Sequence, residues 1–596
     1  MFQQTTQIND LCNKQIGENG HCEYSWIDSK YTKELIVQFN YQLVRTNDSE
    51  QIQYLEHILR DIITQLQDSL EYGKLLPSEF KEQIIILYKL IGYTRDIIDG
   101  KGEYMLAFMQ ILVWYDFYPE LAKKALKSFV LLNDDEHPYG SWKDIKYFCN
   151  YCKKNLKNGS EHPLVEYSIK LANDQLLNDY LQTNKYELTL VSKWIPREKS
   201  NKFSWLFKKM AYDYFSNYLT TANNMDQMIR ARNKCLMDYR KIIATLNKDL
   251  ETVQINQCDQ KWSSIEPNRI TSKTLYKQRK AFFNIKPETN YMRVMNSDRY
   301  VCSQQIINYI QTSVSGEIKG KHVYLNEYVK TAIELIQNWN QYEVDLLNSM
   351  WSNNSNENVR LAPMIAMVDT SLSMYCSEIF YTALGLGIRV AEKTLLGKQM
   401  MTFGKKSKWH NLETHSNFVD MVKAITCKDD SSDFSVCKEN NINIGEFSNL
   451  YDGLNTLLEV IHETKMSAKD VKDLNLIIFS DMQIIKEENM DEFSTLYESI
   501  KKKYEETGMK TINRPYALPH IIFWNMKSTD GFPALSIYPN ISMISGNNPK
   551  MLNLYSDKNY IGNSGVYSPT PYTKLIEILN NKRYKLLEEE IENTLL

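Results

Sequence analysis

The chain of 596 residues lacks the long apolar run that a membrane-spanning helix requires. Its apolar stretches, such as those that begin at Ile84 and Ile111, are interrupted by Lys, Asp or Glu before about eighteen residues are reached. The amino terminus, MFQQTTQIND, has neither a basic lead nor an apolar core, so no secretory signal is expected. We therefore expect a protein without membrane contact that works in the cytoplasm, or in association with a virion if the chain is viral.

Cysteine is sparse as well, with ten residues dispersed along the chain. This distribution does not indicate a small disulfide framework, so the thiols are expected to be reduced. Cys149 and Cys152 form a single CxxC, but neither a second pair nor a suitably spaced His completes a zinc site. Cysteines that pack between helices are the favoured interpretation.

Sequence motifs of catalysis are also lacking. The nine His residues show no HExxH or HxH spacing, and no GxSxG turn occurs. Gly100-Lys101-Gly102 lacks the gap and the Ser or Thr of a phosphate-binding P-loop, and Gly385-Leu386-Gly387 lacks the third glycine of a dinucleotide site. The sequence therefore predicts a protein that is not an enzyme and that uses no nucleotide cofactor.

The composition is that of a folded protein. Hydrophobic residues make up 43% of the chain and charged residues 24%, which excludes a mostly disordered, collagenous or coiled-coil protein. The length favours about two to four globular units.

Apolar residues recur at helical spacing from about residue 50 to about residue 345. In the first such stretch they form one stripe along a helix, made of Leu55, Ile58, Leu59, Ile62, Ile63 and Leu66. Further helical stretches follow at 81–93, 103–117 and 119–132, and strand-like alternation is nearly absent. The sequence predicts an α-helical domain over residues 1–345.

The pattern changes after an Asn- and Ser-rich segment, and we place a linker at residues 346–360. Beyond it, short apolar runs alternate with helical stretches; the runs lie at 361–368, 399–403, 474–480, 519–526 and 541–545. Short buried strands separated by helices predict a parallel sheet covered on both faces. Residues 361–596 are therefore expected to form a doubly wound, Rossmann-like α/β domain that ends in a helix, which gives the whole chain an α + α/β fold class.

Polar residues follow the predicted strands at their carboxyl ends, where open parallel sheets bind ligands. Asp369, Ser371 and Ser373 follow the first strand, Asp481 follows the strand 474–480, and Ser448 opens a helix between them. Two carboxylates and three hydroxyls form an oxygen-only set, which suits a hard divalent cation such as Mg²⁺ or Mn²⁺. The alternative interpretation is that each residue merely caps a helix or ends a strand.

This order of residues resembles the metal-ion-dependent adhesion site of von Willebrand factor A domains, which begins with DxSxS. The resemblance implies that Ser371 and Ser373 ligate the metal directly and that Ser448 stands where the family usually has Thr. It also implies that Asp369 and Asp481 act mostly through bound water, and that one metal position stays open for a partner's carboxylate. Met482 departs from the family, which usually has Gly after this Asp.

The helical part carries a second resemblance. The segments that begin at Arg95, Tyr139, Lys193 and Tyr239 resemble a family of uncharacterised proteins from plants and large DNA viruses, in which a helical region precedes a von Willebrand A domain. That layout is similar to the Ro autoantigen (TROVE) family, whose HEAT-like helical repeats bind single-stranded RNA ends and structured RNA. The resemblance implies a HEAT-like helical domain and RNA as a partner.

Charge is distributed unevenly over the chain. The total net charge is −3, but residues 151–300 carry +11 while the segments on either side carry −7 each. Such an excess attracts polyanions. The candidate RNA-binding residues are Lys193, Arg197, Lys199, Lys202, Lys208, Lys209, Arg230, Arg232, Lys234, Arg240 and Lys241.

Aromatic residues are interleaved with these cations. Trp194, Phe203, Trp205 and Tyr239 could stack on unpaired bases or could be core residues of helices whose other faces are basic. Both interpretations fit the sequence.

The sequence as a whole indicates a binding protein that is not an enzyme. The helical domain is expected to bind RNA, and the α/β domain is expected to bind a second partner through its metal. The alternative is a protein-interaction scaffold or virion structural component that does not bind nucleic acid, which the mild overall acidity favours.

Overall fold

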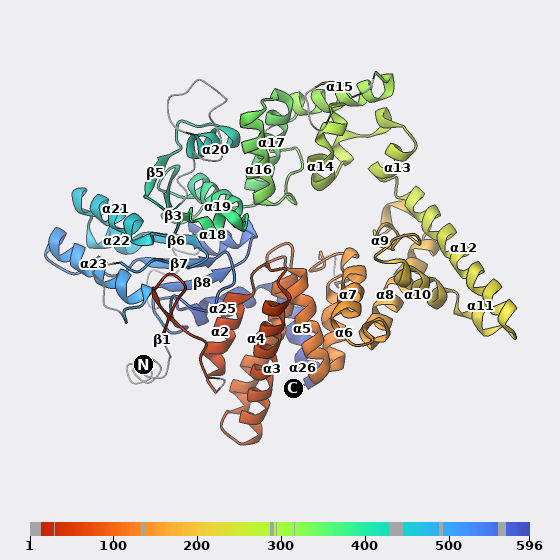
Figure 1. Cartoon of the computed structure of the whole chain (residues 1–596), viewed down its shortest axis with the longest axis horizontal. Helices are drawn as coiled ribbons and strands as arrows, with labels where there is room; N and C mark the ends of the chain where they lie inside the picture. Colours follow the sequence, from red (N-terminus) through yellow and green to blue (C-terminus); the bar gives the residue numbers. More distant parts are fainter. Residues whose placement is uncertain are drawn as a thin grey trace.

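The computed structural model describes residues 14–28, 30–132, 137–286, 291–293, 295–314, 316–427, 445–487, 493–557 and 568–595. These residues form a helical part and a part built around a sheet (Figure 1). Among them, no helix combines the length and the apolar content that a bilayer crossing requires.

The helical part confirms the helical pattern. Its main elements are α3 (Ser49–Glu71), α4 (Pro77–Arg95), α5 (Tyr104–Phe117), α6 (Pro119–Ser128), α7 (Lys143–Asn155), α8 (Pro163–Leu181), α9 (Val191–Trp194), α10 (Ser204–Tyr214), α11 (Ser216–Thr220), α12 (Met225–Asp249), α13 (Val253–Cys258), α14 (Ser272–Phe282), α15 (Ser297–Thr312), α16 (Leu325–Gln337) and α17 (Gln341–Ser355). In α3 the predicted stripe is buried apart from Ile58, which is half-buried. The described residues from 50 to 345 form helices and no sheet.

The segment predicted to be a linker is mostly helical. Residues 346–355 lie in α17, where Leu346, Leu347, Met350 and Trp351 are buried. The Trp351 ring stacks on Phe418 with 3.8 Å between ring centroids. Asn354 and Ser355 are buried as well, and they form hydrogen bonds with Arg389 and Glu392 of α19 (Ile379–Lys393), so residues 346–355 belong to a packed helix.

The carboxy-terminal part contains one six-stranded sheet among the described residues. The strands are β3 (Met364–Asp369), β4 (Gln399–Phe403), β5 (Lys408–Asn411), β6 (Asn475–Ser480), β7 (His520–Asn525) and β8 (Ile541–Ser545), in the order β5-β4-β3-β6-β7-β8. All neighbouring strands are parallel except β4 and β5. The five predicted strands are confirmed; β5 gave no signal, because it is short and only His410 in it is buried.

Helices connect the strands and complete the fold. They are α18 (Leu372–Cys376), α19 (Ile379–Lys393), α20 (Phe418–Thr426), α21 (Leu450–Glu463), α22 (Ala468–Asp473), α23 (Leu496–Ile512), α25 (Pro571–Leu579) and α26 (Lys585–Leu595), with a 3-10 helix η7 (Pro549–Tyr555). The chain therefore has an α + α/β layout with a mostly parallel sheet.

The amino-terminal residues pack on this sheet part. The strands β1 (Lys14–Ile16) and β2 (Cys22–Tyr24) form an antiparallel hairpin, and Tyr24 exchanges two backbone hydrogen bonds of 3.0 and 2.9 Å with Phe532. The following helix α2 (Thr32–Gln42) contacts α3 and α4 on one side and β8 and α25 on the other. Residues Glu34 to Gln42 of α2 are all buried.

The carboxy-terminal helix packs on the helical part. α26 contacts α4 and α6 and lies among the amino-terminal helices in Figure 1. Just before α26, Arg583 forms two hydrogen bonds of 2.8 and 2.7 Å with the buried carboxylate of Asp96, at the end of α4. Each end of the chain thus packs on the other part: the amino-terminal hairpin and α2 contact the sheet part, and the carboxy-terminal α26 contacts the helical part.

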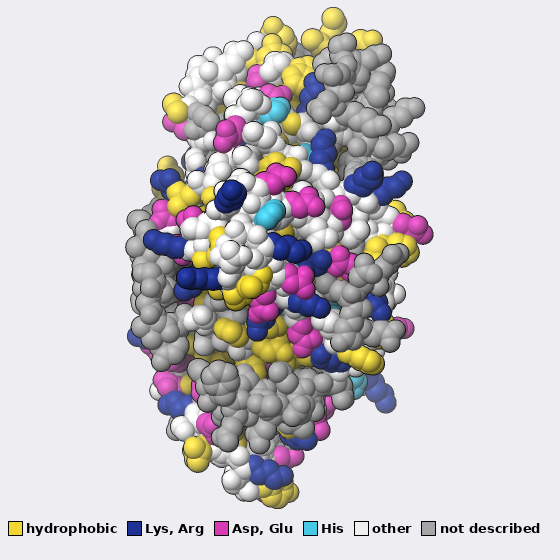
Figure 2. Space-filling view, turned by 90° about the vertical axis from the view of Figure 1, so that its left-hand side faces the viewer, with side chains coloured by type: hydrophobic (Ala, Val, Ile, Leu, Met, Phe, Trp, Pro, Cys, Tyr) yellow, Lys and Arg dark blue, Asp and Glu magenta, His cyan; other side chains and the backbone are white. Residues whose placement is uncertain are grey.

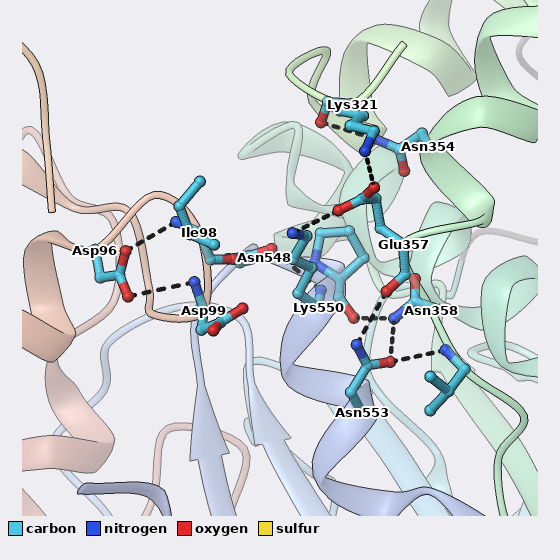
Figure 3. A network of polar contacts seen from close by, with 12 residues as sticks. Asp96, Ile98, Asp99, Lys321, Asn354, Glu357, Asn358, Asn548, Lys550 and Asn553 are labelled. Atoms are coloured by element: carbon cyan, nitrogen blue, oxygen red, sulfur yellow. Dashed lines mark hydrogen bonds and ion pairs between the residues drawn. The ribbon is translucent and has the colours of Figure 1, made fainter. Parts of the chain in front are cut away.

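A polar network joins the parts at a third place (Figure 3). The Glu357 carboxylate, just after α17, forms ion pairs with Lys321 and Lys550. Asn548, just before η7, donates hydrogen bonds of 3.1 and 2.7 Å to the carbonyl oxygens of Ile98 and Gly100, after α4. The network fixes the α4–α5 connection against the sheet part.

Candidate metal centre

The five predicted ligands come from the carboxyl ends of two adjacent strands and from one helix start. Asp369 ends β3 and Asp481 directly follows β6, which is the parallel neighbour of β3. Ser371 and Ser373 follow β3, and Ser448 lies just before α21. Because parallel strands end at the same edge, the sheet topology brings these residues together.

Hydrogen bonds connect all five residues. Ser448 donates to Oδ2 of Asp369 over 2.8 Å, and the Ser371 backbone N–H donates to Oδ1 over 2.8 Å. Ser373 donates to Oδ2 of Asp481 over 2.7 Å, and its hydroxyl lies 3.1 Å from that of Ser371. The structure therefore places the predicted ligands in one cluster, which we call the β3–β6 cluster.

A sixth residue, Ser480, belongs to the cluster. Its hydroxyl donates to Oδ2 of Asp369 over 2.5 Å and accepts a hydrogen bond of 2.9 Å from the Met482 backbone N–H. The sequence places Ser480 beside Asp481 but gives it no role, because a Ser at the end of a buried strand has no motif of its own. Its burial at the strand end was the available signal.

The loop after Asp481 adopts an unusual backbone conformation. Met482 has a φ of 63°, in the left-handed region that favours glycine. This is the residue at which the sequence has Met where von Willebrand A domains usually have Gly.

Burial leaves negative charge in the cluster. Asp369 and Asp481 are both 0% exposed, and in the described part of the chain neither forms an ion pair with a basic side chain. The pKa of Asp369 is raised to about 6, first by burial and then by the nearby charge of Asp481, while hydrogen bonds from Ser480, Ser371 and Ser448 act in the opposite direction. A cation between the carboxylates would remove this conflict.

The donor set is oxygen-only. The described residues hold no group of three or more His, Cys, Asp or Glu side chains suited to a metal ion, so any metal here depends on two carboxylates and on hydroxyls. Ser373 is half-buried and Leu372 beside it is exposed, which makes this the outward side of the cluster.

The amino-terminal hairpin braces the loops that carry the cluster. At the hairpin turn, Asn19 donates a hydrogen bond of 2.7 Å to the Gln483 carbonyl oxygen, and Gln483 donates one of 2.6 Å to Glu18. Directly before β2, Nε2 of His21 lies 2.6 Å from the hydroxyl of Tyr451 on α21. The Asp481 loop and the Ser448 segment are also joined directly, by a hydrogen bond of 3.0 Å from Ile485 N–H to the Ser448 carbonyl oxygen.

The predicted RNA-binding residues lie in two groups. Lys193 lies on α9, Arg197, Lys199 and Lys202 lie between α9 and α10, and Lys208 and Lys209 lie on α10; Arg230, Arg232, Lys234, Arg240 and Lys241 lie on α12. Three of these cations have carboxylate partners: Lys209 with Glu161 at 2.6 Å, Arg240 with Glu198 at 3.0 Å and Lys241 with Asp238 at 3.2 Å.

The aromatic residues between these cations differ in burial. Tyr239 is fully buried and donates a hydrogen bond of 2.8 Å to Asn173, so its ring belongs to the core. Trp194, Phe203 and Trp205 are half-buried. On the side of the molecule where α21 and α23 lie, by contrast, basic and acidic side chains are interspersed (Figure 2).

Part of the chain matches a known protein family. Residues 363–569 match a family model described as a domain of unknown function, DUF7788. The matched range covers less than half of the chain and runs from β3 through β8, so it includes all residues of the β3–β6 cluster. No curated protein matches the chain.

Proposed function

We propose that the β3–β6 cluster binds a divalent cation, Mg²⁺ or Mn²⁺, and that the cation binds a carboxylate of a protein partner. The observation that carries this proposal is the single hydrogen-bonded cluster of two buried carboxylates and four hydroxyls without a basic partner among the described residues. Oxygen ligands of this kind fit a hard cation. In this proposal the α/β part is a von Willebrand A-like domain with a metal-ion-dependent adhesion site.

Each residue has a role in this proposal. Ser371 and Ser373 ligate the cation, while Asp369 and Asp481 supply the compensating charge, mostly through water. Ser448 and Ser480 hold Asp369 in place by donating to its carboxylate. The bound cation would supply an electrophilic position for the partner's carboxylate, so the function is binding and not catalysis.

We further propose that the helical part binds RNA and is HEAT-like, in a TROVE-like arrangement. The excess of +11 over residues 151–300 supports this, because phosphate neutralisation by Lys and Arg drives nucleic-acid binding. The protein would then be a ribonucleoprotein component of the cytoplasm or a virion.

Titration calorimetry with Mg²⁺ and Mn²⁺ tests the metal site. We expect the wild type to bind one cation and Asp369→Asn to bind at least about tenfold more weakly, because the substitution removes one of two charges from the cluster. The matched control is Asp61→Asn, which removes an exposed carboxylate from α3. Equal affinity of Asp369→Asn and the wild type, with both folded by circular dichroism, would refute the metal site.

Filter binding of single-stranded RNA across a salt series tests the RNA function. We expect the affinity to fall steeply as salt increases, since binding releases counterions. No binding at low salt, or binding that does not change with salt, contradicts RNA binding.

The second candidate function is a protein-interaction scaffold or virion component that does not bind RNA. The interspersed charges on the face over α21 and α23 and the net charge of −3 favour it. Under this alternative, Asp369→Asn still binds the cation more weakly than the wild type, but the filter-binding experiment detects no RNA binding.

A further inference from the structure

Cations and aromatic rings from three segments of the helical part meet at one place. Lys143, Lys146 and Tyr147 lie on α7, Trp194 ends α9, and Lys202 and Phe203 lie just before α10. We call these six residues, together with Arg197, the α7–α9 cluster. The α7 residues are not among the RNA-binding residues expected from the sequence, because they lie outside the basic segment 151–300.

The distances within the cluster are short. Nζ of Lys146 lies 4.7 Å from the ring centroid of Trp194 and 5.7 Å from those of both Tyr147 and Phe203. Nζ of Lys202 lies 5.2 Å from the centroids of Tyr147 and Phe203, and Nζ of Lys143 lies 5.0 Å from that of Tyr147. Three lysines thus surround three rings.

The positive charge of the cluster is not neutralised. Within the described residues, no carboxylate forms an ion pair with Lys143, Lys146, Arg197 or Lys202. The two acidic residues closest in sequence are engaged elsewhere: Asp144 pairs with Arg95 at 2.7 Å and Glu198 pairs with Arg240 at 3.0 Å.

The electrostatics of Lys146 agree with this geometry. Its pKa is lowered to about 8, first by burial and then by the charges of Lys143 and Arg197. Cations that repel one another in this way gain most from an anion that binds between them.

The rings of the cluster are positioned to contact a base. Tyr147, Trp194 and Phe203 are half-buried, so each is held by the core and keeps part of its surface accessible. Tyr147 and Phe203 pack edge to face at 5.5 Å between centroids, which fixes their orientation. Unpaired bases stack on such rings, whereas bases within a duplex are not accessible to them.

The basic face of α12 lacks this combination. Arg240 and Lys241 are paired with carboxylates, and Tyr239 is buried. Arg232 and Lys234 each lie over one ring, Tyr212 and Tyr218 respectively. α12 therefore presents single cation–ring pairs where the α7–α9 cluster presents several cations around several rings.

We infer that the α7–α9 cluster is the site at which the protein binds single-stranded RNA. Phosphates of the strand pair with Lys143, Lys146, Arg197 and Lys202, and a base stacks on the accessible part of Trp194 or its neighbouring rings. This inference rests on the RNA binding proposed above and assigns it to one location.

Fluorescence anisotropy with a labelled oligouridylate of about twelve nucleotides tests the location. The full-length variant K143A/K146A is expected to bind at least about tenfold more weakly than the wild type. Its salt slope should be shallower by about 1.4, because two phosphate contacts are lost at about 0.7 each. Lys143 is exposed and Lys146 is half-buried, and neither forms an ion pair with a described carboxylate, so circular dichroism should show an unchanged fold.

The matched control is R230A/R232A, which removes two exposed cations from α12. It is expected to weaken binding by less than about threefold, through the general field alone. Loss of binding in R230A/R232A together with wild-type affinity in K143A/K146A would overturn the location while leaving RNA binding intact. A wild type that does not bind the oligonucleotide at low salt would instead overturn the RNA function itself.

A second comparison separates base stacking from phosphate binding. Trp194→Ala is expected to weaken binding without changing the salt slope, and Trp194→Phe is expected to restore most of it, since Phe keeps a stacking surface. Inorganic polyphosphate should compete poorly with the oligonucleotide. If polyphosphate competes as well as unlabelled oligonucleotide, the cluster is a general anion site and the inference is wrong.

Discussion

Single hydroxyl groups hold the carboxylates of the β3–β6 cluster. Asp369 is fully buried and accepts hydrogen bonds from Ser448, Ser480 and the Ser371 backbone. Donors aimed at a carboxylate favour its charged form, whereas burial beside Asp481 opposes it. The carboxylate of Asp369 is therefore stable in its buried position because several hydrogen-bond donors point at it.

Ser480→Ala is expected to destabilise the sheet part. The variant removes a donor to Asp369 and leaves the Met482 backbone N–H without its acceptor, which should lower the free energy of unfolding by about 1–3 kcal/mol. Hydrogen exchange of β3 and β6 in urea, followed by mass spectrometry, measures the change. Ser377→Ala, which alters an exposed hydroxyl nearby, should have an effect below about 0.5 kcal/mol, and equal effects of the two substitutions would contradict the role of Ser480.

At the scale of elements, contacts with distant parts of the chain determine the position of the hairpin β1–β2. It contacts the Asp481 loop through Asn19 and Glu18, and α21 through His21. A two-stranded hairpin is at most marginally stable alone, so these contacts hold it in place. In return, the hairpin fixes the two loops that carry Asp481 and Ser448.

This packing should make stability depend on pH through His21. Burial lowers the pKa of His21 to about 4 from an ordinary value of 6.5. Between these values the unfolded chain binds the proton and the folded chain does not. The contribution of neutral His21 to the free energy of unfolding is therefore fully present above about pH 6.5, and it is lost as the pH falls toward 4. The loss is on the order of 3 kcal/mol.

His21→Gln removes the titration and keeps a polar partner for Tyr451. Urea unfolding at about pH 7.5 and about pH 5 should therefore show a smaller loss of stability on acidification in the variant than in the wild type. His462→Gln, at an exposed position on α21, serves as the control and should behave like the wild type. Equal acid sensitivity of His21→Gln and the wild type would show that His21 is not held neutral.

At the scale of the whole molecule, the two parts are joined by exchange of their ends. α2 is buried between the amino-terminal helices and β8, and α26 packs on α4 and α6. Two buried polar contacts mark these junctions: Arg583 with Asp96, and Nζ of Lys101 with the Asn40 carbonyl oxygen and the Ser545 hydroxyl at 2.5 and 2.7 Å. Leaving one member of such a contact without its partner is costly.

Residues 361–595 are therefore expected not to fold alone. Without residues 14–42, the face of β8 under α2 and the backbone beside Phe532 are exposed, and α26 loses the surface that covers it. Size-exclusion chromatography and near-ultraviolet circular dichroism should show aggregation or loss of fixed tertiary structure. Co-expression with residues 14–360 should restore a folded complex, and a monomeric fragment 361–595 that melts cooperatively would contradict this expectation.

The amino-acid sequence by itself determined the local structure. Helical spacing identified α3 to α6, and short apolar runs identified five strands of the sheet. The residues after those runs and at one helix start identified five of the six members of the β3–β6 cluster. These features depend on neighbours close in sequence, or on the rule that parallel strands end at one edge. Where apolar residues were hidden among Asn and Ser, as in α17, or a strand was short, as in β5, the same rules failed.

Only the tertiary structure decided which distant segments meet. The hairpin against the Asp481 loop, α2 under β8, α26 against α4, and Lys146 of α7 beside Trp194 of α9 all join segments that carry no sequence signal for one another. Their association depends on shape and on the burial of apolar surface, which is non-directional and therefore does not specify a partner from composition alone. The packing of segments distant in sequence, and not a sequence motif, brings the Ser480 hydroxyl to the Asp369 carboxylate and brings together the cations of the α7–α9 cluster.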